Sequence, residues 1–179
     1  MSRVRIVGGQ WRSRLLPVAD APGLRPTPDR VRETVFNWLG QDLAGWRVLD
    51  LFAGSGVLGF EAASRGAASV MMVEQDRSAQ RSLASSAKTL SASCVEMYRG
   101  DAVKFASTCE RPFDLVFLDP PYGKGLLERV GHHLDRLLVA DGWLYVEAEQ
   151  PLDELGSWTT VKRGRAGQVC FQLMRGAPR

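Results

Sequence analysis

Short, nearly continuous apolar runs recur along the 179-residue chain. Runs of this kind are typical of strands that are buried on both faces of a sheet. Near the C-terminal end, the runs 158–161 and 169–174 flank a turn at 163–167 and predict an antiparallel hairpin. The other five predicted strands cover 47–53, 69–75, 94–101, 113–119 and 142–149.

Between the strands, apolar residues recur at the spacing of amphipathic helices. This spacing predicts helices over 57–65, Arg77–Leu90 and 126–139, and another over Asp29–Leu39, which follows two prolines. Strands that alternate with helices build a mostly parallel sheet with right-handed crossovers. We therefore expect an α/β fold around a seven-stranded, mostly parallel sheet that ends in the antiparallel hairpin.

The first residues do not follow this alternation. Residues 1–16 contain two short extended segments around Gly8 and Gly9, which predict a small β-hairpin. The length of the chain suits one domain with a small appendage. We expect a basic hairpin extension over residues 1–22 and a single α/β domain over residues 23–179.

Charge is unevenly distributed, although the formal net charge is only +3. Residues 1–16 and 156–179 hold nine basic residues and no acidic residue, so the middle of the chain is acidic. Basic ends suit contact with a polyanion, and they suit solubility equally well. Three widely spaced cysteines match neither a disulfide framework nor a zinc site, and no run approaches the ~20 apolar residues of a membrane span. We expect a cytoplasmic protein without membrane or metal.

A glycine turn directly follows the first strand of the predicted sheet, where open α/β sheets bind their ligands. The turn lacks the lysine of a phosphate-binding loop. Gly54, Gly56 and Gly59 supply the spacing of a dinucleotide fingerprint, so this turn alone leaves a nicotinamide cofactor open.

Three acidic residues close successive strands and narrow the choice of cofactor. Asp50 precedes the turn, where it would repel a pyrophosphate and hold an ammonium group. Glu74 can accept hydrogen bonds from a ribose diol, and Asp101 can accept one from an adenine amino group. Each acid taken singly could instead be a helix N-cap. Together the three describe S-adenosylmethionine, which carries an amino-acid tail, a ribose and an adenine but no phosphate.

Asp119, Pro120, Pro121 and Tyr122 follow the fourth predicted strand. An exocyclic amine on a base is a weak nucleophile because its lone pair is delocalised into the ring. Two acceptors, the Asp119 carboxylate and the Pro120 carbonyl, can take both N–H hydrogens and aim the lone pair at a methyl donor. Tyr122 can stack on a base that has left its own stack. These four residues are the expected catalytic residues; a plain strand-ending proline turn is the alternative.

Two motifs connect this chemistry to a known family. Residues 50–56, D-L-F-A-G-S-G, resemble motif I of class I methyltransferases. Residues 119–122 resemble the [D/N]-P-P-[Y/F/W] motif of amino methyltransferases that act on adenine N6, guanine N2 or protein glutamine. Three further segments match in order and spacing: R-I-V-G-G-Q-W-R-S-R at 5–14, G-L-R-P-T-P-D-R-V-R-E-T-V-F-N-W-L at 23–39 and A-G-Q-V at 166–169.

Over nearly its whole length the chain resembles the bacterial 16S ribosomal RNA guanine-N2 methyltransferase family of the RsmD type. The resemblance implies a Rossmann-like class I methyltransferase fold, S-adenosylmethionine as donor and S-adenosylhomocysteine as product. It implies a guanine of 16S rRNA as acceptor, in the small subunit or an assembly intermediate, where ribosomal proteins help to present the base. The expected cofactor-binding residues are Thr27, Asp50, Phe52, Ala53, Gly54, Ser55, Gly56, Glu74, Gln75, Asp101 and Ala102.

The basic N-terminal segment is the expected RNA-binding surface. Its arginines can bind phosphates, and Trp11 can stack on a base or else pack the hairpin onto the body. Three rival functions stay open at this point: an adenine-N6 methyltransferase on DNA or RNA, an inactive RNA-binding assembly factor, and a nicotinamide-dependent reductase. The expected RNA-binding residues are Arg3, Arg5, Trp11, Arg12, Arg14, Arg25 and Arg165.

Overall fold

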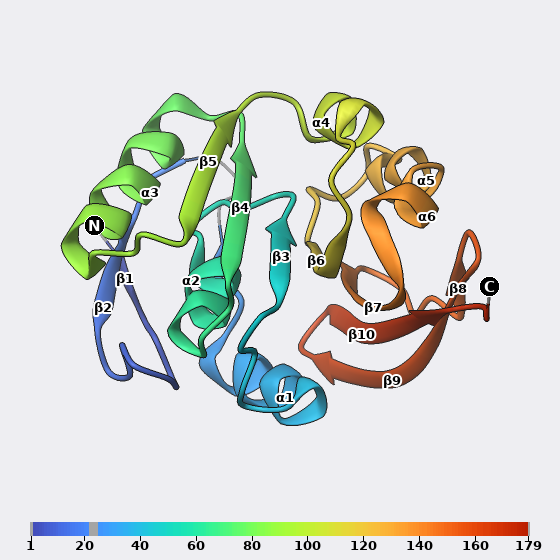
Figure 1. Cartoon of the computed structure of the whole chain (residues 1–179), viewed down its shortest axis with the longest axis horizontal. Coiled ribbons are helices and arrows are strands. Elements are labelled where there is room, and N and C mark those ends of the chain that lie inside the picture. Colours follow the sequence, from blue (N-terminus) through green and yellow to red (C-terminus); the bar gives the residue numbers. More distant parts are fainter. Residues whose placement is uncertain (1, 22–24, 179) are drawn as a thin grey trace.

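The computed structural model describes residues 2–21 and 25–178, which form an eight-stranded sheet with helices on both faces and a separate N-terminal hairpin (Figure 1). The strand order is β5-β4-β3-β6-β7-β10-β9-β8. Strands β3 to β7 run parallel, and β8 to β10 are antiparallel. The strands are β3 (Arg47–Asp50), β4 (Ser69–Glu74), β5 (Val95–Arg99), β6 (Phe113–Leu118), β7 (Leu138–Ala148), β8 (Glu154–Leu155), β9 (Trp158–Ala166) and β10 (Val169–Gly176).

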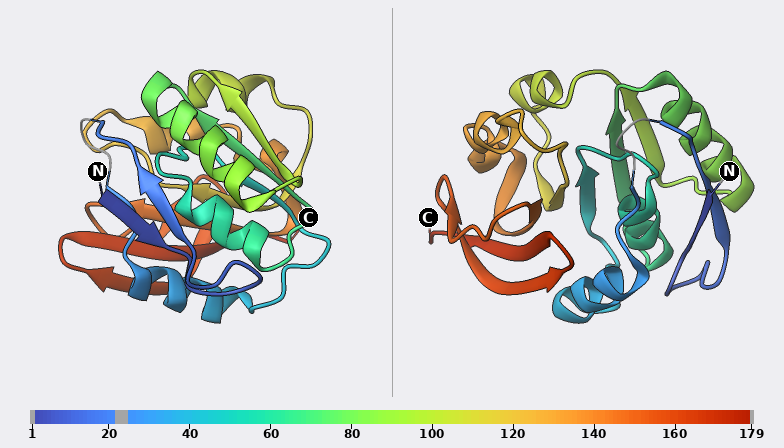
Figure 2. Two further views of the ribbon diagram at one scale, coloured as in Figure 1. Left: turned by 90° about the vertical axis from the view of Figure 1, so that its left-hand side faces the viewer. Right: turned by 180° about the vertical axis from the view of Figure 1, so that it is seen from behind.

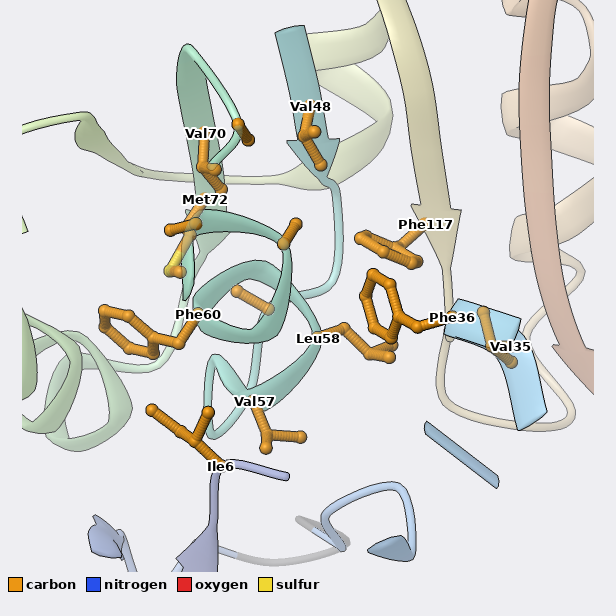
Figure 3. Packing of buried hydrophobic residues seen from close by; sticks show 14 of the residues in the cluster. Ile6, Val35, Phe36, Val48, Val57, Leu58, Phe60, Val70, Met72 and Phe117 are labelled. Carbon is orange, nitrogen blue, oxygen red and sulfur yellow. The ribbon is translucent and has the colours of Figure 1, made fainter. Parts of the chain in front are cut away.

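Alternate residues of each central strand enter two different hydrophobic clusters. Val48, Phe117 and Tyr145 belong to the cluster beneath the N-terminal helices, whereas their neighbours Leu49 and Val116 belong to the other cluster. Figure 3 shows the first cluster, in which side chains from three strands meet those of two helices and the hairpin. Burial on both faces explains why these strands consist of continuous apolar runs.

Helices α1 (Asp29–Leu39), α2 (Val57–Ser64) and α3 (Arg77–Leu90) pack on the first cluster. Helices α4 (Ala102–Thr108), α5 (Leu126–Gly131) and α6 (Leu134–Leu137) pack on the second. The predicted α1 and α3 match their observed bounds, and α3 begins with the Asp76 side chain accepting from Ala79 N at 2.8 Å. In the described part of the chain, no helix is long and apolar enough to cross a membrane.

Four elements differ from the sequence-based expectation. The predicted turn 163–167 is mostly strand, because β9 continues to Ala166 through its pairing with β10 and only residues 167 and 168 form the turn. The predicted helix 126–139 is two short helices, because Leu138 already pairs with Phe113 at the start of β7. Leucines at this point satisfy a helical stripe and a buried strand equally well, and the strand pairing decides. The eighth strand is the two-residue edge strand β8, and the seven-residue helix α4 was not predicted; both are too short to show a period.

The N-terminal hairpin pairs β1 (Ser2–Arg5) with β2 (Leu15–Val18) and lies along α2 and α3 (Figures 1 and 2). Its loop touches the end of α2, where Gln10 N donates to the carbonyl of Ser64 at 2.8 Å. Gly9 has a φ of +77°, and a Cβ there would lie 2.1 Å from the same carbonyl oxygen, so only glycine permits this contact. The hairpin therefore shares the first hydrophobic cluster. The predicted boundary between residues 22 and 23 lies outside the described residues.

Candidate active site

The site lies where the strand order reverses, between β3 and β6. From β3 the chain proceeds outward to β4 and β5, and it then returns to β6 and β7 on the other side. Such a switch point leaves a crevice at the carboxyl ends of the two neighbouring strands. Asp50 is the last residue of β3 and Asp119 directly follows β6, so the two motifs found in the sequence meet at this crevice.

The glycine turn after β3 is held by two carboxylates. Gly54 N donates to Glu74 Oε2 at 2.8 Å, and Gly59 N donates to Asp50 Oδ2 at 3.0 Å. Gly56 starts α2 with a φ of +79°, and a Cβ on it would lie 2.3 Å from Leu83. Its small size therefore lets α2 start close to α3 and close to the strand ends.

Asp50 is a buried carboxyl, 2% exposed. Burial raises its pKa to about 7, the hydrogen bond from Gly59 lowers the pKa, and the charges of Glu74 and Glu147 raise it. In the described part of the chain, no Lys or Arg forms an ion pair with it. A buried acid without a basic partner fits an external cation, and the ammonium group of S-adenosylmethionine is such a cation.

The other predicted cofactor residues surround the same strand ends. Glu74 closes β4 and is half-buried, and its Oε1 accepts from Asp76 N at 3.0 Å. Asp101 is the N-cap of α4, where it accepts from Lys104 N at 2.8 Å, so the capping alternative describes its contact. It stays exposed at the end of β5. The remaining predicted contacts are Phe52, Ala53 and Ser55 in the turn, Gln75 after β4 and Ala102 at the start of α4.

The four residues after β6 combine a shielded acid with an accessible ring. Asp119 is half-buried and Pro120 is buried, whereas Pro121 and Tyr122 are exposed, Tyr122 to 44%. Burial raises the pKa of Asp119 well above its usual range, and the charges of Glu147 and Asp50 add to this effect. Burial and the charge of Asp119 likewise raise the pKa of Tyr122, which therefore keeps its phenolic proton at neutral pH.

Glu147, which was not among the predicted site residues, lies beside Asp119. It is 6% exposed, and its Oε1 accepts from Thr27 Oγ1 and from the Tyr145 hydroxyl, each at 2.7 Å. Thr27, a predicted cofactor contact, is itself buried and has this carboxylate as its partner. The one sign in the sequence was a glutamate within an otherwise apolar strand, Leu144–Ala148 in the run L-Y-V-E-A.

Thr27 is held in place by a buried ionic network at the hairpin. Arg32 donates from Nε to the carbonyl of Thr27 at 3.0 Å, and from Nη1 to Glu61 Oε1 and to the carbonyl of Arg5, both at 2.6 Å. Glu61 also pairs with Arg65, and all three charged side chains are buried. The hairpin, α1 and α2 are thereby tied to the acceptor side of the site. This network was not foreseen either.

The predicted RNA-binding residues divide into two groups. Trp11 is only 8% exposed and packs into the first hydrophobic cluster, so the packing alternative holds and the prediction that it stacks on a base is wrong. The arginines are all exposed. Arg165 lies on β9, on the β7–β10 side of the sheet, whereas Arg3, Arg5, Arg12 and Arg14 belong to the hairpin beside α2 and α3. The exposed arginines are Arg3, Arg5, Arg12, Arg14, Arg25 and Arg165.

No group of three or more His, Cys, Asp and Glu side chains is arranged to hold a metal ion among residues 2–21 and 25–178. What the residues do bring together is a glycine turn, a line of carboxylates and an Asp-Pro-Pro-Tyr segment at one crevice.

Comparison with known proteins agrees with this arrangement. A model of the family described as conserved hypothetical protein 95 matches residues 4–175. The chain is 43% identical to ribosomal RNA small subunit methyltransferase D of Escherichia coli K12, with 96% of this chain and 89% of the relative covered. It is 41% identical to the protein of the same name from Haemophilus influenzae, with 95% and 92% covered.

A solved structure shows the same fold. The Escherichia coli protein provisionally called methyltransferase yhhF aligns with a TM-score of 0.89 at 41% identity, and 99% of this chain and 100% of that chain are covered. This agreement confirms the expected α/β methyltransferase fold with its antiparallel C-terminal strands and N-terminal hairpin. The chain therefore belongs to the conserved hypothetical protein 95 family, the family of ribosomal RNA small subunit methyltransferase D.

Proposed function

We propose that this protein is an S-adenosylmethionine-dependent methyltransferase that modifies the exocyclic N2 amine of a guanine in 16S rRNA. The enzyme class and the rRNA substrate follow from its family. The choice of an amine acceptor rests on one observation: Asp119–Tyr122 follows β6 at the switch point, next to the turn that begins with Asp50. The choice of guanine rests on the resemblance of the motifs.

The residues at the crevice suit this reaction. S-adenosylmethionine supplies an electrophilic methyl group on a sulfonium centre. The Asp119 carboxylate and the Pro120 carbonyl accept the two N–H hydrogens of the base amine, which directs its lone pair outward. Tyr122 is exposed and neutral, so its ring can stack on a base that has left the RNA helix. When the N–CH3 bond forms and the S–CH3 bond breaks, S-adenosylhomocysteine leaves with the electron pair of the S–C bond, and the amine gives up one proton to solvent.

The RNA surface is also part of the proposal. Exposed arginines on the hairpin can hold phosphates at a distance from the site and so orient the RNA without reading its sequence. We place the reaction on the small subunit or an assembly intermediate in the cytoplasm, where ribosomal proteins help to present the guanine. The proposed mechanism uses neither a metal nor a membrane.

A transfer assay with one variant tests the role of Asp119. Small subunits that lack the modification are incubated with the enzyme and methyl-labelled S-adenosylmethionine. We expect Asp119→Ala to abolish transfer and to leave the cofactor Kd, measured by calorimetry, within about threefold of wild type. The control is Asp141→Ala, which alters an exposed acid near the other end of β7 and should transfer normally. Loss of cofactor binding in Asp119→Ala would contradict the assigned role.

A further inference from the structure

A glutamate inside the apolar strand β7 is the least expected residue of the site. Glu147 follows Leu144, Tyr145 and Val146, all of which are fully buried. An ionised carboxylate in such a position destabilises the fold unless it is paired or neutralised. No basic side chain of the described residues forms an ion pair with it. The strand therefore retains a destabilising residue that calls for a functional explanation.

Sheet geometry places this carboxyl next to Asp119. Leu118 pairs with Val146 in the parallel ladder of β6 and β7, so the next residues of both strands, Asp119 and Glu147, are neighbours. Alternate residues share a face, and Phe117 and Tyr145 contact each other on the face that α1 and α2 cover. Asp119 and Glu147 lie on this same face, and both the charge of Glu147 and a side-chain hydrogen bond with it raise the pKa of Asp119.

A hydrogen bond between two carboxyl groups requires one proton, because a carboxylate by itself only accepts. The pair therefore holds one proton between its two carboxyls, and the raised pKa of Asp119 agrees with this. Both donors to Glu147, the hydroxyls of Thr27 and Tyr145, bind its Oε1. Oε2 is thus left as the oxygen that can share the proton with Asp119.

We propose that Glu147 is a positioning residue that shares one proton with Asp119, so that the Asp119 side chain is fixed with its other oxygen toward the acceptor amine. Thr27 and Tyr145 fix Glu147 in turn, and Arg32 fixes Thr27 through its carbonyl oxygen. This inference rests on the proposed role of Asp119 as an acceptor for the amine hydrogens. Through Thr27 and Glu147, the buried network at the hairpin is connected to Asp119.

Two substitutions at this position separate a positioning role from other roles. Glu147→Gln keeps an oxygen for Thr27 and Tyr145 and an N–H donor for Asp119, whereas Glu147→Ala removes all three contacts. In the transfer assay we expect Glu147→Gln to keep kcat within about threefold of wild type. We expect Glu147→Ala to lower kcat by about 10- to 100-fold, with the KM for small subunits and the cofactor Kd within about threefold of wild type.

Titration of the carboxyl groups gives a second measurement, which does not require the RNA substrate. The 13C side-chain signals of aspartates are followed against pH in the 19.7-kDa protein, and Asp119→Asn identifies the signal of Asp119. Asp50 from β3, Glu147 and Tyr145 from β7, and Tyr122 from the adjoining loop are the titratable groups that act on it. Glu147→Gln replaces the carboxyl that raises the pKa of Asp119 with a neutral amide that can donate to the Asp119 carboxylate, so the pKa of Asp119 should fall.

Three results would overturn this proposal. Equal losses of kcat in Glu147→Gln and Glu147→Ala would overturn the proposal, because position 147 would then need a carboxylate. Normal activity in a correctly folded Glu147→Ala would also overturn the proposal. The same holds for an Asp119 pKa that is equal in Glu147→Gln and in wild type. Wild-type protein that transfers no methyl group to guanine N2 would instead refute the proposed function. The titration would then still decide whether the two carboxyls share a proton.

Discussion

Asp50 has the environment of a charge-binding residue that lacks its charge partner. Its side chain is buried, accepts one backbone hydrogen bond from Gly59, and faces the negative charges of Glu74 and Glu147. With a pKa of about 7, the carboxyl is close to half-protonated at neutral pH. A bound ammonium group stabilises the ionised form and therefore lowers this pKa. Binding of the cofactor at pH 7 must then displace part of a proton.

We predict that S-adenosylmethionine binding at pH 7 releases roughly half a proton from the wild-type protein. Calorimetry in buffers of different ionisation enthalpy measures this release. In Asp50→Asn the release should fall to near zero and the cofactor should bind more weakly, because the amide neither titrates nor pairs with the ammonium group. Equal proton release from both proteins would show that another group titrates.

Some site residues can be predicted from the sequence alone, whereas others become apparent only in the folded structure. Asp50, the glycines after it and Asp119 follow apolar runs directly, so local order alone predicts that they sit at strand ends. Glu147 and Thr27 are 120 residues apart, and only the folded sheet shows that they form a hydrogen bond. Trp11 was open to two interpretations, since an aromatic among arginines suits both an RNA surface and a core. Tertiary packing decided that case.

At the scale of elements, the N-terminal hairpin performs two tasks on its two faces. Its apolar face, which includes Ile6 and Trp11, packs into the first hydrophobic cluster, while its arginines point to solvent. Two short extended segments around Gly8 and Gly9 predicted a hairpin, but the contact of Gly9 with Ser64 depends on where α2 ends and could not be predicted. In the same way, the end of the predicted helix 126–139 depended on a strand pairing far away in the sequence.

We predict that Arg12→Ala combined with Arg14→Ala weakens binding to small-subunit RNA. The slope of log K against log salt concentration should become shallower by about 1 to 2, because each lost phosphate contact removes one released counterion. Filter binding at several salt concentrations measures this slope. The matched control, Lys104→Ala with Arg129→Ala, removes the same charge from exposed positions on α4 and α5 and should leave the slope close to that of wild type.

At the scale of the whole molecule, topology rather than local sequence assembles the site. The reversal of strand order at β3 and β6 brings the cofactor turn and the Asp-Pro-Pro-Tyr segment together. The hairpin, held through Arg32 and Glu61, is in turn connected to Thr27 and Glu147. The alternation of strands and helices predicted this fold class from the sequence. Burial of the ionic network could not be predicted, because its members are far apart in the chain.

The most direct test of the proposed function is the identity of the methylated nucleoside. Small subunits without the modification are treated with the wild-type protein and S-adenosylmethionine, and their 16S rRNA is digested to nucleosides for mass spectrometry. Subunits treated with Asp119→Ala serve as the control. We predict N2-methylguanosine in the wild-type sample and none in the control, whereas N6-methyladenosine, or no methylated nucleoside, would contradict the assignment.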